Sequence, residues 1–311
     1  MNNQIKKINL NHSFIFFLSC NIFSLMALKI VNFTISPLIC LFLILIIGVS
    51  HGSLDNIKGK KLFKIYGLKN FSVFYFIYIL IASFIVFFWS IMPSVSLLIF
   101  LVVASHHFGK EDTQFLLVEN SYFNHLLFFF KGSLVIFAPI YFSFDETVSI
   151  FKLLLIENES FYEFLNVLES KKILLYCIVL STLSSIILFT KNFEFKKFAI
   201  FLDYFSILIL NYYFSPLIAF TIYFCFLHSV RHSISLIYEL DAVSLMNGLK
   251  IFTLKALPLT ILTAIFCFIG LYLLNYAYNF DSSILKIIFI GLASLTFPHI
   301  LLEYLIEKNE K

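Results

Sequence analysis

Residues 71–89 read FSVFYFIYILIASFIVFFW, a stretch without a single charged side chain. A helix needs about 20 apolar residues to cross roughly 30 Å of hydrocarbon, so this stretch predicts a membrane-spanning helix. Further segments have the same character, which predicts an all-α polytopic transmembrane helix bundle of about ten spans, within a range of eight to ten. The predicted spans are 13–31, 33–50, 71–89, 91–107, 125–143, 173–190, 198–214, 215–234, 251–275 and 284–306.

The composition of the whole chain agrees with a membrane protein. Sixty per cent of the residues are hydrophobic, 13% are charged and the mean hydropathy is +0.95, whereas a soluble domain has roughly 25% charged residues. We find no repeat, Gly/Ser linker or low-complexity tail, so we expect one integral membrane domain over residues 1–311. The first apolar segment is longer than a signal-peptide core and has no small-residue cleavage site, so we expect a retained helix.

The lysines predict the orientation of the bundle. The net charge of +4 comes almost wholly from lysines in predicted loops, so it concerns membrane orientation and gives no reason to expect nucleic acid as a partner. Lysines gather at both termini and in the loops 52–70 and 191–197, whereas the loop 144–172 is acidic. In an alternating bundle the lysine-rich regions share one side, which the positive-inside rule makes cytoplasmic. We therefore expect a multi-pass protein of the cell (inner) membrane with both termini in the cytoplasm.

The five cysteines stand singly inside apolar segments, and none forms a CxxC pair. Thiols in such segments usually pack as small hydrophobic groups. Neither a disulfide framework nor a thiolate metal site is expected.

Histidines gather near the cytoplasmic ends of the spans that run inward. Histidine is the commonest metal ligand, and polar groups in spans tend to face the bundle interior. The histidines at similar depth are His51, His106, His107, His228, His232 and His299, whereas His12 and His125 begin spans and are interpreted as interfacial.

His228 and His232 are four residues apart, which places both on one helical face. A metal at roughly 2 Å from each nitrogen bridges such a pair. Adding His51 and His107 gives an all-nitrogen site from three helices, for which iron, zinc and copper are all suitable. The alternative for each single histidine is a hydrogen-bonded structural residue or a proton carrier.

Carboxylates accompany these histidines. Metal-bound imidazoles usually donate their other N–H to a carboxylate or a carbonyl. Asp55, four residues after His51, and Asp112, five residues after His107, are therefore expected to orient the ligands. Glu111 is interpreted as part of a solvated helix end.

Two more charged side chains accompany the histidine motifs. Arg231, inside HSVRH, is expected to pair with one of the acids or with a carbonyl. Glu303 follows His299 by four residues and is expected to orient that ring.

Four local sequences resemble the Brp/Blh family (bacteriorhodopsin-related-protein-like) of membrane β-carotene dioxygenases. They occur in the family's order and span residues 51–305. The four are HGSLDN (51–56), HFGKED (107–112), HSVRH (228–232) and PHILLEYL (298–305).

This resemblance implies that O₂ and β-carotene are the substrates. Cleavage of the central 15,15′ double bond would give two molecules of retinal at a histidine-bound Fe(2+), with a retinal-binding rhodopsin as the consumer of the product. Because β-carotene is a hydrocarbon that resides among membrane lipids, we expect it to enter the bundle laterally.

The resemblance also implies roles for individual residues. The iron ligands would be His51, His107, His228 and His232, and His299 would line the site or act as a further ligand. Asp55 and Asp112 match the family's acidic positions. Adjacent helical residues point about 100° apart, so His107, which begins HFG, is the predicted ligand and His106 is not.

Two other functions compete with this interpretation. A membrane di-iron desaturase or hydroxylase carries several HxxxH and HxxHH boxes, whereas this chain has one HxxxH and no HxxHH. A transporter or proton-coupled protein usually has helices interrupted by Gly or Pro, or acids at mid-span. Here the prolines lie near the ends of predicted helices and the acids lie in predicted loops.

Overall fold

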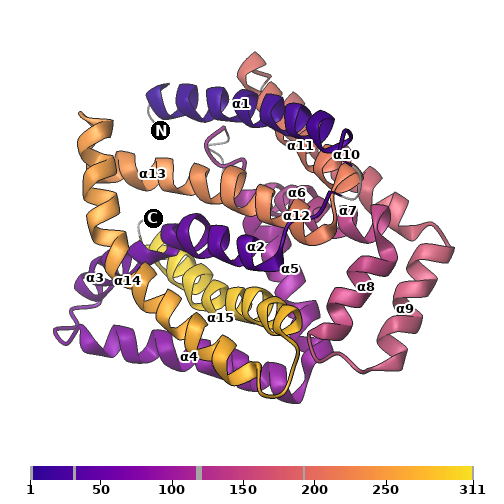
Figure 1. Ribbon diagram of the computed structural model, residues 1–311. Helices are drawn as coiled ribbons and strands as arrows, with labels where there is room; N and C mark the ends of the chain where they lie inside the picture. The colour runs from indigo at the N-terminus through magenta and orange to yellow at the C-terminus, as the bar shows by residue number, and fades with distance from the viewer. Residues whose placement is uncertain (1–2, 31–32, 117–120, 192, 310–311) are drawn as a thin grey trace.

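The computed structural model describes residues 3–30, 33–116, 121–191 and 193–309, apart from the side chains of Asn3 and His51. Every regular element in these ranges is a helix (Figure 1). The predicted all-α polytopic helix bundle is thereby confirmed.

Within the described ranges, eight helical units are long and apolar enough to cross a membrane. Two predicted spans, 91–107 and 198–214, form the helices α5 (Pro93–Glu111) and α11 (Ala199–Tyr213) but are not among the eight. With 15 residues, α11 is shorter than the roughly 20 that a span needs. The eight units are 4–27, 37–65, 72–91, 122–142, 173–190, 216–240, 245–274 and 280–309.

Some of these units are single α-helices and others change helix type along their length. The single helices are α1 (Asn3–Ala27), α4 (Ser72–Ile91), α10 (Ile173–Thr190), α14 (Leu245–Leu274) and α15 (Phe280–Asn309). The composite units are α2 (Pro37–Leu43) with η1 (Ile44–Gly48), η2 (Val49–Leu54) and α3 (Asp55–Ile65); α6 (Tyr122–Gly132) with α7 (Leu134–Phe142); and α12 (Pro216–Ile222) with η4 (Tyr223–Ser229) and α13 (Val230–Leu240).

The loop predicted over 52–70 is wrong, because α3 continues the helix to Ile65. The segment was predicted as a loop because it contains several lysines. Lys60 and Lys61 are exposed, whereas Leu62 and Phe63 are buried in a cluster with residues of α4 and α15. An amphipathic helix with one charged face has the composition of a loop but buries its other face.

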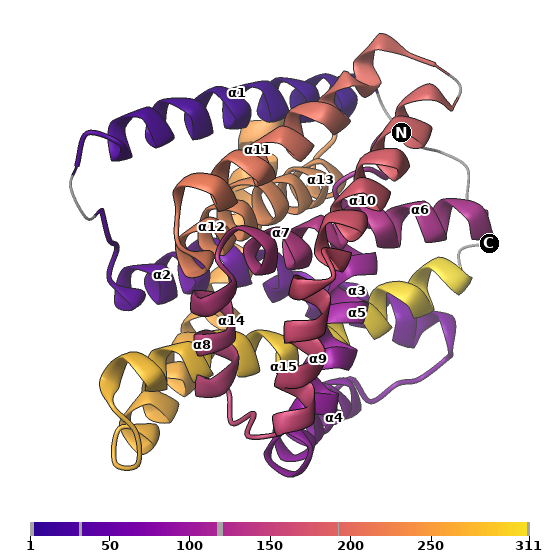
Figure 2. The same cartoon turned by 90° about the vertical axis from the view of Figure 1, so that its right-hand side faces the viewer.

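The predicted acidic loop 144–172 also contains helices, α8 (Phe144–Leu153) and α9 (Glu159–Ser170). They lie at the opposite side of the bundle from α3 and the two chain ends in Figure 1, and in front of it in Figure 2. Trp89, fully buried near the end of α4, donates a hydrogen bond of 3.0 Å from its indole N–H to the carbonyl of Leu154, which ties α4 to the segment after α8. A short 3₁₀ helix, η3 (Phe195–Phe198), precedes α11.

Prolines both begin helices and lie inside them. Pro37, Pro93 and Pro216 stand at the first turns of α2, α5 and α12, where a missing N–H costs nothing. The expectation that all the prolines lie near helix ends is nevertheless wrong, since α7, α14 and α15 contain Pro139, Pro258 and Pro298 in their interiors. Neighbouring helices in a membrane bundle tolerate such interruptions.

Two π-helical segments, η1 and η4, contact each other in the middle of the bundle. The hydroxyl of Ser229 donates to the carbonyl of Gly48 across this contact, at 3.1 Å. A Cβ on Gly48 would overlap the ring of Phe224, so glycine allows the two segments to approach. π-Helical turns are frequent at functional sites, and η4 contains His228.

The helices α5 and α6 cross at two reciprocal glycines. A Cβ on Gly109 would overlap the carbonyl of Phe128, and one on Gly132 would overlap the carbonyl of Ser105. Small residues of this kind let helix backbones approach closely in membranes. The contact fixes the end of α5 from which His107 projects.

Candidate metal centre

Four described imidazoles form one buried cluster. His107 comes from α5, His228 from η4, His232 from α13 and His299 from α15. The ring centroid of His107 lies 5.2 Å from that of His228 and 5.6 Å from that of His299. The ring centroids of His232 and His299 are 5.6 Å apart. The backbone of His51 lies in η2, but its side chain lies outside the described residues.

A buried carboxylate stands behind three of these rings, in each case at Nδ1. The Nδ1 atom of His228 lies 3.2 Å from Asp112 Oδ1, and that of His232 lies 3.0 Å from Glu111 Oε2. The Nδ1 atom of His299 lies 2.9 Å from both carboxylate oxygens of Asp55.

These contacts select the tautomer of each ring. An ionised carboxylate only accepts hydrogen bonds, so each of the three Nδ1 atoms donates its proton. The lone pair of a neutral ring is then on Nε2, which is the arrangement of histidines that bind metals.

A further carboxylate faces the Nε2 atoms. Glu303 Oε1 lies 3.5 Å from His232 Nε2 and 3.6 Å from His299 Nε2. The ammonium of Lys58 donates to the same oxygen at 2.7 Å and lies 3.4 Å from His232 Nε2. Glu303 is therefore a member of the cluster and not only a neighbour of His299 along the helix.

The donor atoms are close enough together to share one ion. Those of His232, His299 and Glu303 lie within 4.8 Å of one another, as do those of His107, Glu111 and Glu303. Opposite ligands of an ion bonded at about 2 Å lie roughly 4 Å apart, so small adjustments complete either set. Imidazole nitrogens with a carboxylate oxygen suit iron, and the residues present therefore fit this metal.

Two tyrosine hydroxyls hold two of the carboxylates in place. The hydroxyl of Tyr78 donates to Asp55 Oδ2 at 2.8 Å, and that of Tyr223 donates to Asp112 Oδ2 at 2.7 Å. Neither tyrosine belongs to one of the four motifs: Tyr78 lies on the apolar helix α4, and Tyr223 begins η4, five residues before His228. The sequence therefore offered no signal for either.

Arg231 is buried and holds the backbone next to the site. Its guanidinium donates to the carbonyl oxygen of Asp112 at 2.9 Å and to Asp203 Oδ2 at 2.7 Å. It also donates to the hydroxyl of Ser13 at 2.7 Å. The sequence prediction that it pairs with an acid or a carbonyl agrees with these contacts, but its main acidic partner, Asp203, was not foreseen.

The structure changes the partners that sequence spacing indicated. Asp55 contacts His299 from a distance of 244 positions along the chain, and Asp112 contacts His228. The interpretation of Glu111 as a solvated helix end is wrong, since its exposed fraction is 6% and it contacts His232. These are contacts between helices, and only the packing of the bundle determines them.

Three other described histidines, His12, His106 and His125, make different contacts. His106 Nε2 lies 3.0 Å from His125 Nδ1, and the two rings stack. His12 Nε2 lies 2.8 Å from the carbonyl of Phe226 in η4, so it supports the π-helical turn that contains His228.

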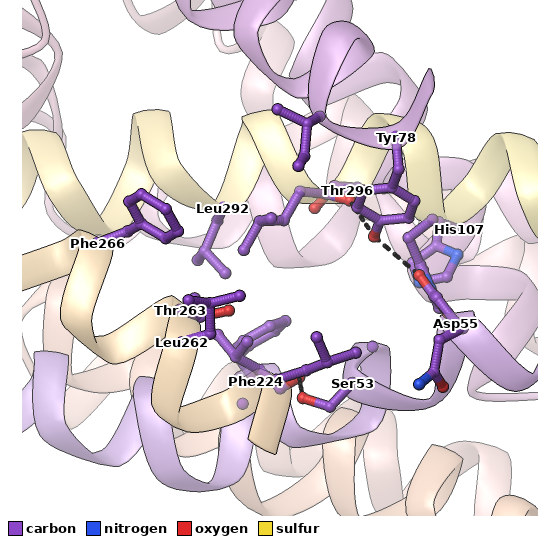
Figure 3. Close-up of a pocket in the computed structure, with 18 of the residues that line it drawn as sticks. Ser53, Asp55, Tyr78, His107, Phe224, Leu262, Thr263, Phe266, Leu292 and Thr296 are labelled. Atoms are coloured by element: carbon purple, nitrogen blue, oxygen red, sulfur yellow. Dashed lines mark hydrogen bonds and ion pairs between the residues drawn. The ribbon is translucent and has the colours of Figure 1, made fainter. Parts of the chain in front are cut away.

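An apolar cavity of about 230 Å³ reaches the cluster. Figure 3 shows His107 and Asp55 at one end of it and Phe266 and Leu292 at the other. A second cavity, of about 640 Å³, shares lining residues with the first, so the two are adjoining. The buried polar cluster therefore faces a space whose other walls are mainly apolar.

Comparisons with known proteins agree with the motifs. Residues 42–307 match a family described as β-carotene 15,15′-dioxygenase. A protein named β-carotene 15,15′-dioxygenase, from an uncultured marine bacterium (66A03), is 27% identical over 275 residues, which cover 84% of this chain and 90% of the relative. No solved structure matches the chain.

Proposed function

The chain belongs to the β-carotene 15,15′-dioxygenase family, and on this premise we propose that it cleaves the central double bond of β-carotene with O₂ to give two molecules of retinal. The observation that supports this most directly is the buried histidine cluster, with carboxylates behind its rings, at the end of an apolar cavity. The apolar cavity suits a hydrocarbon substrate, and the histidine cluster suits the metal of an oxygenase.

We assign the binding of Fe(2+) to His51, His107, His228 and His232, with His299 as a further ligand. Asp112, Glu111 and Asp55 accept hydrogen bonds from the Nδ1 atoms of their histidine partners. This leaves the lone pair of each ring on Nε2, where it is available to the metal, and raises the basicity of that nitrogen. When bound, the iron supplies open coordination positions at which O₂ can be activated.

The reaction balances without any further reductant. The 15,15′ carbon–carbon double bond and the O–O bond break, two C=O bonds form, and each retinal keeps one oxygen atom. The apolar walls of the cavity orient the polyene, because the substrate has no polar group to bind, and they keep water away from the reacting carbons.

The location of the protein agrees with this chemistry. Eight apolar helical units in the described ranges make it a membrane protein, and β-carotene dissolves in the same lipid. We further propose the cell (inner) membrane as its site, both termini in the cytoplasm, and a retinal-binding rhodopsin as the consumer of the product.

The test is expression in a bacterium that accumulates β-carotene. We expect loss of the carotenoid colour and retinal in the extract, both dependent on O₂ and on iron. The control is the His228→Ala/His232→Ala variant, which removes two ligands but leaves the bundle to insert, since helix burial rather than the metal holds it together. Persistence of colour in cells whose membranes contain the wild-type protein with bound iron would exclude the proposed reaction.

A further inference from the structure

The two apolar cavities adjoin between α4, α14 and α15. Residues of all three helices line both cavities, and we call this shared space the α4–α14 groove. The shared lining includes Tyr78, Ile79, Thr263, Phe266, Leu292 and Leu295. The first cavity reaches the histidine cluster, and the second adjoins it at these shared residues.

The groove is open toward lipid. Ile79 of α4 and Phe266 of α14, which line both cavities, have exposed fractions of 63% and 64%. Both helices have the length and the hydropathy of membrane spans and pack against α15. Exposed apolar side chains on a span contact acyl chains, so a lipid-soluble molecule can pass between them without crossing water.

The far part of the groove offers no charge. The residues that line the second cavity include no Asp, Glu, Lys, Arg or His. Two of its hydroxyls are already used within their own helices: Ser90 donates to the carbonyl of Phe87 at 2.7 Å, and Ser294 donates to that of Gly291 at 2.8 Å. The occupant must therefore be apolar and elongated, and its fit depends on shape.

Gly291 leaves a recess in this wall. A Cβ built on Gly291 would meet no atom within 4 Å, so the space above it is open. Most other glycines of the chain are covered by a neighbouring backbone or side chain. A recess next to an otherwise narrow groove suits a group that is thicker than a polyene.

The position of this recess along α15 matches the length of half a β-carotene molecule. Gly291 precedes His299 by eight residues (299 − 291), which corresponds to about 12 Å of helix. About nine bonds separate the central carbon of β-carotene from its terminal ring, and an extended chain advances roughly 1.2 Å per bond, which gives about 11 Å.

We propose that one half of the carotenoid lies in the α4–α14 groove and that its terminal ring lies in the recess at Gly291. This inference rests on the proposed function. It makes Gly291 a specificity-determining residue, because the groove admits a cyclic end group at this distance from the histidines only while the position has no side chain.

The experiment replaces Gly291 by Ala, Leu and Phe and compares two substrates. One is β-carotene, and the other is β-apo-8′-carotenal, which lacks one terminal ring and can place its shortened half in the groove. We expect the ratio of kcat/KM for β-carotene to that for the apocarotenal to fall progressively, by at least about tenfold for Gly291→Phe. These substitutions raise helix propensity, and their Cβ atom meets open space, so the variants should insert normally.

The matched control is Leu301→Phe, on the same helix. Leu301 has an exposed fraction of 43% and lines neither cavity, so the ratio should not change. A Gly291→Phe variant that loses activity on both substrates equally, or on neither, would overturn the proposal.

Binding without turnover tests the groove separately from the reaction. Under anaerobic conditions, the purified wild-type protein should retain β-carotene, seen in its visible absorption, and Gly291→Phe should retain at least about tenfold less. Absence of retinal formation by the wild type under air would contradict the proposed function. Equal carotenoid retention by both proteins would contradict the groove assignment.

Discussion

His106 and His107 are neighbours on α5, yet their side chains take part in different contacts. His107 lines the cavity beside His228 and His299, whereas His106 pairs with His125 at 3.0 Å. The rotation of about 100° between adjacent helical residues explains the separation. The HFG motif and the geometry thus favour the same histidine.

We expect His107→Ala to lower retinal formation and iron content by more than about 100-fold, since loss of even an outer partner of a metal ligand costs 10- to 100-fold. His106→Ala should retain most of both, because it removes only the pair with His125. Iron content, membrane yield and retinal formation are measured for each variant. If the His106→Ala protein were inactive and free of iron while the His107→Ala protein stayed active, His106 and not His107 would be the metal ligand.

The carboxylates behind the rings give a second test at this scale. Glu111→Gln keeps the shape of the side chain but removes the negative charge beside His232, so we expect iron affinity to fall by about 10- to 100-fold. Glu307→Gln is the matched control. Glu307 pairs with Lys110 on the surface, with an exposed fraction of 39%, and such pairs contribute little. Metal titration followed by iron analysis measures the difference, and equal affinities in the two variants would argue against the role of Glu111.

At the scale of helices, hydropathy predicted much of what the structure shows. Each predicted span corresponds to a helix, because long uncharged stretches have few alternatives in a membrane. The extension of α3 to Ile65 was missed because Lys60, Lys61 and Lys64, which lie on its exposed face, give the segment the composition of a loop. The π-helical segments were also missed, since an extra residue in a helical turn depends on packing, here on η1 against η4.

The sequence indicated the histidines of the candidate site, but neither all of its other members nor its contacts. The motifs identified His107, His228, His232 and the acids next to them, because these residue types are unusual in spans. The partners were assigned by spacing along one helix, whereas the observed pairs, such as Asp55 with His299, join different helices. Sequence separation contains no information on which helices become neighbours.

The glycine crossing of α5 and α6 yields a prediction for a whole helix. In Gly109→Ala the new methyl group would overlap the backbone carbonyl of Phe128, so α5 must shift. We expect a loss of about 1–3 kcal/mol in stability together with reduced iron content, because His107 lies two residues away. Thermal unfolding in detergent and iron analysis are the measurements.

Val102→Leu serves as the control for this substitution. It also adds one carbon atom to α5, but at a position with an exposed fraction of 55%, where lipid can yield. An unchanged melting temperature in Gly109→Ala would show that the crossing has more space than the structure indicates.

For the whole molecule, the arrangement of the chain ends agrees with the lysine pattern. Figure 1 shows α3 and both ends of the chain at one side of the bundle, and α8 and α9 at the other. The positive-inside rule places the lysine-rich side in the cytoplasm. In the proposed orientation, the histidine cluster lies toward the cytoplasmic side, where α3 and the end of α15 meet.

Topology reporters test this orientation. A reporter fused in the turn at Gly67 should report the cytoplasm, and one fused at Asn158, between α8 and α9, should report the opposite side. We expect these signals because the first region has an excess of lysines and the second has an excess of acidic residues. This expectation requires α5 to cross the membrane in addition to the spans 72–91 and 122–142. A cytoplasmic signal at both positions would show that α5 does not cross.

The contact between Asp55 and His299, 244 positions apart, sets an order for the biogenesis of the site. At roughly 5–20 residues per second, a ribosome needs about 10–50 s to travel from one to the other. Throughout that interval the earlier helices are already in the membrane with their polar side chains, and the translocon and its chaperones must shield them. The proposed iron would reach its full set of partners only after α15 has been inserted, so loading of the metal would be a maturation step that follows the synthesis of this helix.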